Sequence, residues 1–196
     1  MSLILGPDKE CDYLDERNED FSNEDFDSSS FCSSSFKGCN FLSSSFRSAS
    51  FVDCTFIDCN FSSSDFTSSS FSRCNFVSCL FKGTVFSKVR MKDVKIENSS
   101  FLYVSFDNSD LKNSGIYNSK INDGSFSDVS CKNFSLHSDN LLGTSFRGTM
   151  LSLISLKMSD ISGIYLSEGA KELNGAKLDV SQALDAAKLI GVEIIE

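Results

Sequence analysis

Large apolar residues recur at every fifth position along most of the chain. The register begins at Phe21, continues without an insertion to Leu166, and includes eighteen of the nineteen phenylalanines. A fixed internal period of this kind indicates a repeat architecture and takes precedence over residue-by-residue assignment of helices and strands. A period of five matches neither the 3.6-residue turn of an α-helix nor the two-residue alternation of a strand.

A second pattern of small residues lies two positions before each large one. Between residues 29 and 164, 24 of the 28 such positions hold Ser, Ala, Cys, Thr, Gly or Val. Residues two apart on an extended segment point the same way, so the small and the large residue both point inward. The other two residues, often Ser, Asp, Asn or Gly, then turn a corner. Each five-residue unit is therefore predicted to be one short extended face followed by one bend.

This pattern resembles the pentapeptide repeat family, whose loose consensus is a small residue, Asp or Asn, Leu or Phe, and two variable residues. The resemblance covers about residues 19–168. It implies an all-β fold, a right-handed quadrilateral β-helix with four units in each twenty-residue coil. Thirty units form seven and a half coils, which at ~4.8 Å per coil make a rod roughly 36 Å long.

Three regions are expected from this register. An acidic N-terminal segment covers residues 1–18, the repeat β-helix covers residues 19–168, and a C-terminal cap with a dimerisation helix covers residues 169–196. The cap lies beyond the last register position, so the repeat makes no prediction for its structure.

A short C-terminal α-helix is predicted over residues 179–190. Asp179 and Gln182 have the spacing of a capping box, and Gly191 is a natural residue for the helix end. The segment Val192-Glu193-Ile194 alternates like a short strand. The apolar face of the helix consists of Val180, Ala183, Leu184, Ala187 and Ile190.

The tail from about Leu173 to Ile195 resembles the C-terminal ends of quinolone-resistance pentapeptide repeat proteins, which protect DNA gyrase. The resemblance is carried by Lys177-Leu178, Gln182-Ala183 and Gly191. It implies a homodimer joined through the helix, and the alternative is a simple cap on the last coil. The expected interface residues are Leu184, Ala187, Leu189, Ile190 and Ile194.

Residues twenty apart are expected to stack above one another. The longest aromatic column is Phe26, Phe46, Phe66, Phe86, Phe106, Phe126 and Phe146, and the cysteines form two columns, Cys39-Cys59-Cys79 and Cys54-Cys74. We expect these cysteines to be small space-filling thiols, because parallel side chains at strand spacing suit neither tetrahedral zinc nor disulfide geometry.

One part of the register is irregular. Phe134 occupies a position that should hold a small residue, and Cys131 just before it is a small residue at a large position. Asp139 also takes an inward position, where Ser119 and Ser159 are its expected column neighbours. A locally distorted coil and a functional pocket both fit these substitutions.

Charge is divided unevenly along the chain. The formal net charge is −9, with −8 in residues 1–27, +2 in residues 28–166 and −3 in residues 167–196. A negative net charge disfavours nucleic acid as a direct partner. It makes the acidic residues near the N terminus candidates for binding a protein that normally binds nucleic acid: Glu19, Asp20, Glu24, Asp25 and Asp27.

The body of the rod has a basic feature of its own. Lys92, Lys112 and Lys132 are twenty apart and should form an outward column, with Arg73 and Arg90 on the same face. Such a column fits an acidic protein or another polyanion. The alternative is a solvated face of mixed charge, because Asp53, Asp93 and Asp110 are interspersed there.

The sequence contains no motif that indicates catalysis, a metal or a cofactor. The only histidine, His137, follows a large register residue and should face solvent. No apolar stretch is long enough to span a membrane, and the N terminus lacks the features of a secretory signal, so a cytoplasmic location is expected.

The expected function is therefore non-catalytic binding of a protein. The family resemblance implies DNA mimicry and modulation of DNA gyrase, as in quinolone resistance. The alternative is a structural or regulatory scaffold with no topoisomerase role. A duplex of ~36 Å would carry about −21 charges, whereas the repeat body carries +2, so mimicry would be confined to acidic ends.

Overall fold

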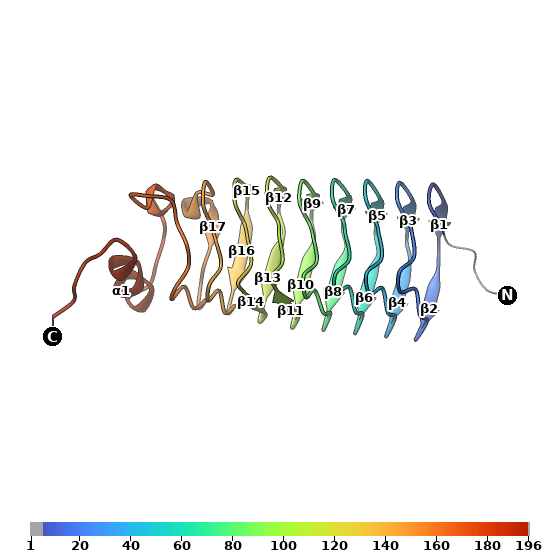
Figure 1. The fold of residues 1–196 in the computed structure, drawn as a ribbon, viewed down its shortest axis with the longest axis horizontal. Helices are drawn as coiled ribbons and strands as arrows, with labels where there is room; N and C mark the ends of the chain where they lie inside the picture. The colour runs from blue at the N-terminus through green and yellow to red at the C-terminus, as the bar shows by residue number, and fades with distance from the viewer. Residues whose placement is uncertain (1–5, 196) are drawn as a thin grey trace.

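The chain winds into a parallel β-solenoid of about seven coils in a computed structural model that describes residues 6–195 (Figure 1). Every paired strand joins residues whose numbers differ by twenty, as in Phe31↔Phe51 and Lys95↔Gly115. The predicted twenty-residue coil and all-β fold are confirmed. The two ends of the described chain lie at opposite ends of the rod (Figure 1).

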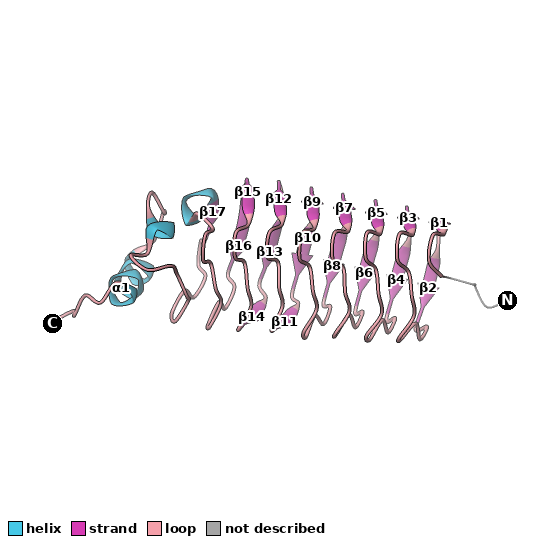
Figure 2. Cartoon of the chain, turned by 45° about the horizontal axis from the view of Figure 1, so that its top comes forward, coloured by secondary structure: helices cyan, strands magenta, loops and turns pink. Residues whose placement is uncertain are grey.

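Strands on three sides of the coil form three parallel sheets, and within each sheet the strands follow one another along the rod (Figure 2). The first sheet contains β1 (Glu10–Asp12), β3 (Ser30–Cys32), β5 (Ser50–Val52), β7 (Ser70–Ser72), β9 (Arg90–Lys92), β12 (Asp110–Lys112) and β15 (Ser130–Lys132). The second contains β2 (Asp15–Arg17), β4 (Ser35–Lys37), β6 (Thr55–Ile57), β8 (Asn75–Val77), β10 (Lys95–Glu97), β13 (Gly115–Tyr117), β16 (Phe134–His137) and β17 (Ile154–Ser155). The third contains β11 (Ser100–Leu102) and β14 (Lys120–Asn122), and isolated bridges such as Asp25↔Ser45 connect the coils on the fourth side.

From residue 23 to residue 148, the corners of the coil lie at the second residue after each register residue. Ser33, Asn98 and Asp123 have φ angles of 50°, 52° and 52° at such positions. This left-handed region is disfavoured for most residues, and Gly, Asn and Asp tolerate it best. The polar, turn-forming residues of the repeat therefore serve the bends, as predicted.

The core consists of the stacked register residues. In the column from Phe26 to Phe146 each ring stacks on the next, with centroids 4.6 Å apart for Phe46 and Phe66 and 4.9 Å apart for Phe66 and Phe86. Neighbouring units of one coil meet edge to face, as Phe61 and Phe66 do. The predicted phenylalanine column is confirmed, and all seven of its rings are buried.

The small inward residues are also hydrogen-bond donors. Thr84 Oγ1 donates to the carbonyl of Phe61 at 2.7 Å, and Thr149 Oγ1 donates to that of Phe126 at 2.6 Å. Cys54 Sγ lies 3.4 Å from the carbonyl oxygen of Phe31 in the same arrangement. Buried backbone carbonyls need donors, so Ser, Thr and Cys satisfy a group at this position as well as filling space.

All eight cysteines are free thiols, and we predict that only Cys32 reacts quickly in the folded protein. Cys32 is half-buried, whereas the other seven are buried, and burial raises the pKa of Cys131 to about 12. Because the thiolate is the reactive form, buried thiols should be labelled only as fast as their coils open. Iodoacetamide labelling followed by mass spectrometry should show one fast site, and Cys32→Ser should remove it. Fast labelling of Cys54 or Cys74 would contradict the prediction.

The solenoid begins earlier than residue 19, the boundary expected from the repeat. Strands β1 and β2 lie within the expected acidic segment and pair with β3 and β4, while residues 1–5 of that segment lie outside the described residues. The register residues here are Cys11 and Glu16, which give no signal of a large apolar position. An end coil has a neighbour on one side only, so it accepts such residues.

The first described coil carries charge at positions that are inward in later coils. Glu16 is half-buried, and Glu19 and Glu24 are exposed, although their counterparts in the next coil, Phe36, Cys39 and Ser44, are buried. Charged side chains at inward positions discourage another chain from pairing with an exposed sheet edge. The acidic side chains therefore protect this end of the rod from pairing with another chain.

The last coils contain η1 (Leu151–Leu153), and the C-terminal cap contains η2 (Lys171–Leu173) and α1 (Val180–Leu189). The capping box is confirmed, since Gln182 N–H donates to Asp179 Oδ1 at 2.9 Å and Asp179 N–H donates to Gln182 Oε1 at 3.1 Å. Gly191, with φ of 80°, ends the helix in a Schellman arrangement. The predicted strand over Val192–Ile194 is wrong, because this segment pairs with no other described strand.

Gln182 holds α1 on the rod, and its removal should loosen the helix. Its buried Nε2 donates to the carbonyls of Leu156 at 2.6 Å and Ser159 at 2.7 Å. Gln182→Ala is expected to weaken docking of α1 by about 2 kcal/mol through these lost bonds and the capping box. Amide hydrogen exchange of α1 should accelerate while the phenylalanine coils remain protected. The exposed neighbour variant Ser181→Ala should exchange like the parent, and unchanged exchange in Gln182→Ala would refute the role.

Candidate binding surface

The three lysines of the basic column occupy equivalent positions on adjacent strands of the first sheet. Lys92↔Lys112 and Lys112↔Lys132 are register partners on β9, β12 and β15, and all three side chains are exposed. None of them forms an ion pair with a carboxylate within residues 6–195. The spacing of twenty therefore produces the predicted column of adjacent positive charges.

The two arginines expected on this face have different surroundings. Arg73 forms a two-pronged ion pair with Asp53, with Nε–Oδ1 at 2.6 Å and Nη2–Oδ2 at 2.7 Å, and this hydrogen bonding lowers the pKa of Asp53. Arg90 lies on the same strand as Lys92 and is the register partner of Asp110. Arg73 is thus neutralised locally, whereas the lysine column is not.

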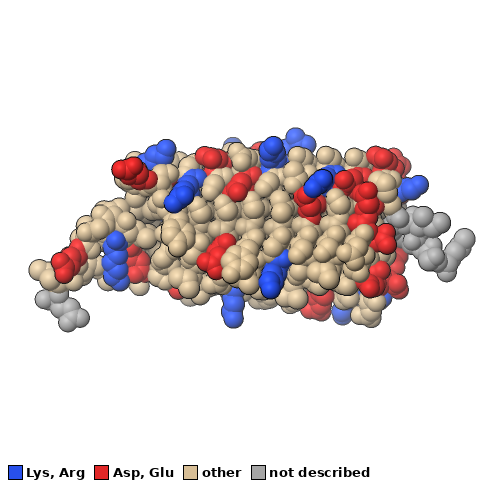
Figure 3. All heavy atoms as spheres, in the orientation of Figure 1, with Lys and Arg blue, Asp and Glu red and all other residues tan. Residues whose placement is uncertain are grey.

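The acidic candidates lie together in one coil near the N-terminal end, where acidic side chains gather (Figure 3). The side chain and the N–H of Ser22, together with Asn40 Nδ2, stabilise the carboxylate of Asp20 and lower its pKa, and Asp27 accepts from the N–H of Arg47. The other three carboxylates belong to exposed residues. Those of Glu19 and Glu24 accept no hydrogen bond from a described side chain or backbone group, and that of Asp25 accepts one from the N–H of Asp27. The structure keeps this acidic coil away from the lysine column.

The apolar face predicted for α1 is largely uncovered. Val180, Leu184 and Ile190 are 80%, 45% and 57% exposed, while the buried side of the helix presents Gln182 and Ala186 to the rod. Of the other interface candidates, Ile194 is exposed and Ala187 is half-buried. Leu189 packs against the solenoid core, so it is less available to a second protein.

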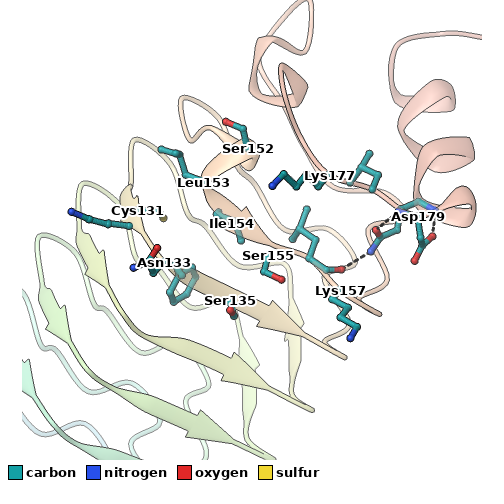
Figure 4. Close-up of a pocket in the computed structure, with 15 residues that line it drawn as sticks. Cys131, Asn133, Ser135, Ser152, Leu153, Ile154, Ser155, Lys157, Lys177 and Asp179 are labelled. Carbon is teal, nitrogen blue, oxygen red and sulfur yellow. Dashed lines mark hydrogen bonds between the residues drawn. The ribbon is translucent and has the colours of Figure 1, made fainter.

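A hollow of about 740 Å³ lies between the last coils and the cap, and we call it the C-terminal hollow (Figure 4). It exists because residues 151–153 form η1 where a further strand of the first sheet would otherwise follow β15. Its lining includes Cys131–Ser135, Ser152–Lys157, and Lys177, Leu178, Asp179 and Gln182. Three of its residues are lysines, Lys132, Lys157 and Lys177.

The irregular register around residue 134 proves to be mainly a local distortion. Phe134 is buried and extends β16 to four residues, and Cys131 is also buried. Both residues line the C-terminal hollow, but Asp139 does not. The three residues therefore do not form one pocket.

Asp139 is a buried carboxyl group inside the rod, only 2% exposed. Ser119 N–H donates to its Oδ1 at 2.7 Å, and its own N–H donates to Ser159 Oγ at 3.0 Å, so the predicted neighbours are correct. Its Oδ2 has no hydrogen-bond partner among the described residues. Burial raises the pKa of Asp139 to about 7, and the N–H bonds oppose this rise only in part.

Sequence reasoning missed Glu172, a fully buried carboxylate in η2. Its Oε1 accepts from the N–H of Gly148 at 2.9 Å and its Oε2 from the N–H of Ser167 at 3.3 Å. Glu172 lies beyond the register, where the repeat gives no signal. It joins the cap to the last coils and is a structural residue.

Within residues 6–195, no three His, Cys, Asp or Glu side chains are grouped to hold a metal ion. The half-buried His137 lies near Tyr117, with ring centroids 6.3 Å apart. No described helix has the length and apolar character needed to cross a bilayer.

The architecture consists of five-residue units, twenty-residue coils and an apolar column on every side. Residues 29–106 match the family model of the pentapeptide repeat region. This part of the chain is a pentapeptide repeat region. The coil geometry continues beyond the matched residues on both sides, from β1 to the bridge Ser145↔Tyr165. No curated protein matches its sequence.

Several solved structures are similar to this one. A trypsin-treated variant of QnrB1, a plasmid-mediated fluoroquinolone resistance protein, is 19% identical with a TM-score of 0.47, covering 95% of this chain and 100% of that chain. Full-length QnrB1 is 15% identical with a TM-score of 0.47, covering 93% and 100%. HetL, involved in heterocyst differentiation regulation in the cyanobacterium Nostoc, is 11% identical with a TM-score of 0.36, covering 85% and 93%.

Proposed function

We propose that this protein is a non-catalytic dimeric rod that acts by binding another protein. The observation that carries the proposal is the uncovered apolar face of α1, where Val180 and Leu184 are exposed four residues apart and Ile190 is exposed at the end of the helix. Exposed apolar residues grouped on one face are typical of protein interfaces. A rigid solenoid then holds its outer side chains in fixed columns for a partner.

The dimer is tested by charge on this face. Leu184→Lys with Ile190→Lys places two charges in the proposed interface and should convert a dimer into a monomer in light scattering. As a control, Ser181→Lys adds a charge at an exposed position of the same helix and should leave the mass measured by light scattering unchanged. A parent chain that has the monomer mass at micromolar concentration would refute the interface.

DNA gyrase is the first candidate partner. A dimer joined at the cap would place an acidic N-terminal coil at each far end, since the two ends of the chain lie at opposite ends of the rod (Figure 1). These carboxylates, with −8 in residues 1–27, would imitate the phosphates of a DNA segment at two points. The tail from Leu173 to Ile195, which resembles those of gyrase-protecting proteins, supports the same candidate.

A supercoiling assay with fluoroquinolone tests this candidate. We expect micromolar protein to inhibit gyrase or to protect it from the drug, and the neutralised variant Glu19→Gln with Glu24→Gln and Asp25→Asn to lose most of the effect. The matched control removes three exposed carboxylates on other coils, with Asp58→Asn, Asp123→Asn and Asp160→Asn. If the parent chain shows no inhibition and no protection, gyrase is excluded as the partner.

The second candidate is a structural or regulatory scaffold with no topoisomerase role. It is favoured by the column of Lys92, Lys112 and Lys132, which forms no ion pair within residues 6–195 and has the wrong charge for a DNA mimic. Affinity capture from the native host, with the triple variant of these lysines to glutamate as a control, distinguishes the candidates. A dominant partner other than a topoisomerase, lost in the variant, would support the scaffold.

A further inference from the structure

The C-terminal hollow is the place where two sheets of the solenoid stop short. The first sheet ends at β15 because residues 151–153 turn into η1, and the second ends at the two-residue strand β17. Residues 177–179 pass on the other side of the hollow without joining either sheet (Figure 4). Strand edges therefore border the hollow without a strand to pair with them.

Backbone donors are left free at these edges. In each earlier coil the N–H of the corner residue after the first-sheet strand donates to the next coil, as Asn113 N–H does to the carbonyl of Lys132 at 2.8 Å. The corresponding N–H of Asn133 has no acceptor among the described residues, and neither do those of Cys131 and Leu156. All three residues line the hollow, so it is bordered by donors that lack partners.

The charge of the hollow is positive. Lys132 is the last residue of the lysine column, and the lining contains two further cations, Lys157 and Lys177. None of the three forms an ion pair within the described part of the chain. The one carboxylate in the lining, Asp179, is already committed to capping α1. The lysine column thus leads into a donor-rich hollow lined by three lysines and one carboxylate.

We propose that the C-terminal hollow binds an extended acidic segment of a protein partner, which adds a strand at the free sheet edges. Backbone carbonyls of the segment accept from the free N–H groups, as in other cases of strand addition. Its carboxylates face the three lysines, and its alternate apolar side chains contact the exposed Leu153 and the half-buried Leu178. This inference rests on the proposed function, because it presumes that the rod binds a protein.

A peptide fits this site better than a nucleic acid does. A strand provides carbonyl oxygens at a spacing that matches a free sheet edge, together with alternating apolar side chains. The net charge of −9 opposes approach of a polyanion as long and as highly charged as DNA or RNA. A short acidic segment needs only the local field of Lys132, Lys157 and Lys177.

The test uses the full chain and a fluorescent capped peptide in which Glu and Val alternate. Fluorescence anisotropy should show saturable binding that weakens roughly tenfold or more in Lys132→Glu with Lys157→Glu and Lys177→Glu. The matched control reverses three exposed lysines elsewhere, Lys37→Glu with Lys82→Glu and Lys88→Glu, and should bind within about twofold of the parent. A peptide in which Lys and Val alternate should not bind, and circular dichroism should show that both variants are folded.

Hydrogen exchange of the complex separates strand addition from simple charge attraction. The peptide should slow exchange in residues 130–134 and 153–157 and leave the corresponding segments of earlier coils unchanged. Absence of this protection would overturn strand addition. Equal weakening by both triple variants, or tighter binding of a single-stranded DNA of similar charge, would overturn the assigned site or its ligand.

The same variants distinguish failure of this inference from failure of the proposed function. A protein partner captured equally by the parent and by the variant at Lys132, Lys157 and Lys177 would refute the hollow as its site and leave protein binding standing. Peptide binding with the expected protection, but no partner captured from the host, would support the hollow and count against the wider function.

Discussion

Replacing Phe66 with alanine is expected to lower the free energy of unfolding by about 4 kcal/mol. The ring is 1% exposed and lies between Phe46, 4.6 Å away, and Phe86, 4.9 Å away, in the longest stack of the core. Ladder hydrogen bonds hold the coils above and below at a fixed spacing, so they cannot close over the missing ring. The truncation therefore loses both the transfer free energy of the ring and the contacts of its neighbours. Urea unfolding followed by circular dichroism measures the change.

The matched control is Phe21→Ala near the open end of the same core. Phe21 is half-buried, and its one stacked partner among the described residues is Phe41 at 5.2 Å. The cost should be less than half that at Phe66, because an end coil has one neighbour and can relax. Equal costs at the two positions would contradict a core organised as stacked neighbours.

Replacing Asp139 with asparagine is expected to stabilise the protein by up to about 4 kcal/mol at pH 8. The pKa of Asp139 is raised from 3.8 to about 7 by burial, and each pKa unit corresponds to about 1.4 kcal/mol. At pH 8 the folded protein must hold a buried carboxylate whose Oδ2 has no partner within the described chain. Asparagine has nearly the same shape and carries no charge.

The sign of the effect depends on pH. Below about pH 4 the carboxyl is protonated in both folded and unfolded chains, so Asp139 contributes no pH dependence there. Between about 4 and 7 the folded chain keeps a proton that the unfolded chain has released, so stability falls as pH rises through this window. Urea midpoints of the parent should drop across it, and those of Asp139→Asn should drop less. Asp58→Asn, at an exposed turn, should keep the parental slope; a parental slope in Asp139→Asn would refute the assignment.

The fold follows from side-chain size at two positions in five, which is why the sequence predicts it so completely. A large residue such as Phe66 and a small one such as Ser64 alternate inward on every side, and no insertion disturbs their spacing. The prediction of the repeat boundary fails at the N-terminal end, where the packing requirement for an inward residue differs. Cys11 and Glu16 enter the solenoid without being large and apolar, because an end coil packs on one neighbour only.

The predicted strand at Val192–Ile194 fails for a related reason. Alternation of side chains does not make a strand unless another strand offers hydrogen bonds, and here the chain leaves the solenoid behind α1. The helix itself was predictable, because Asp179 and Gln182 satisfy its first turn locally. Local bonds can be predicted from spacing, whereas pairing with a distant strand cannot.

The candidate surfaces differ in the same way, because one can be predicted from residue spacing and the other cannot. The lysine column was predictable, because a period of twenty places Lys92, Lys112 and Lys132 on adjacent strands. The C-terminal hollow was not, because Leu151 and Leu156 keep the apolar register while the backbone between them leaves the strand path. The free N–H groups result from that departure, and no residue type marks them.

The constant coil length has a consequence for how fast this protein can fold. Each ladder bond closes a loop of about twenty residues, whether it joins β1 to β3 or β12 to β15. The entropy lost on closing a loop depends on loop length, so every added coil meets the same modest barrier. Most β proteins fold slowly because their strands pair over long separations, but here the mean separation of contacts stays near one coil. Folding should therefore start at any phenylalanine-rich coil and spread to its neighbours, and lengthening the rod should leave the rate of the first step almost unchanged.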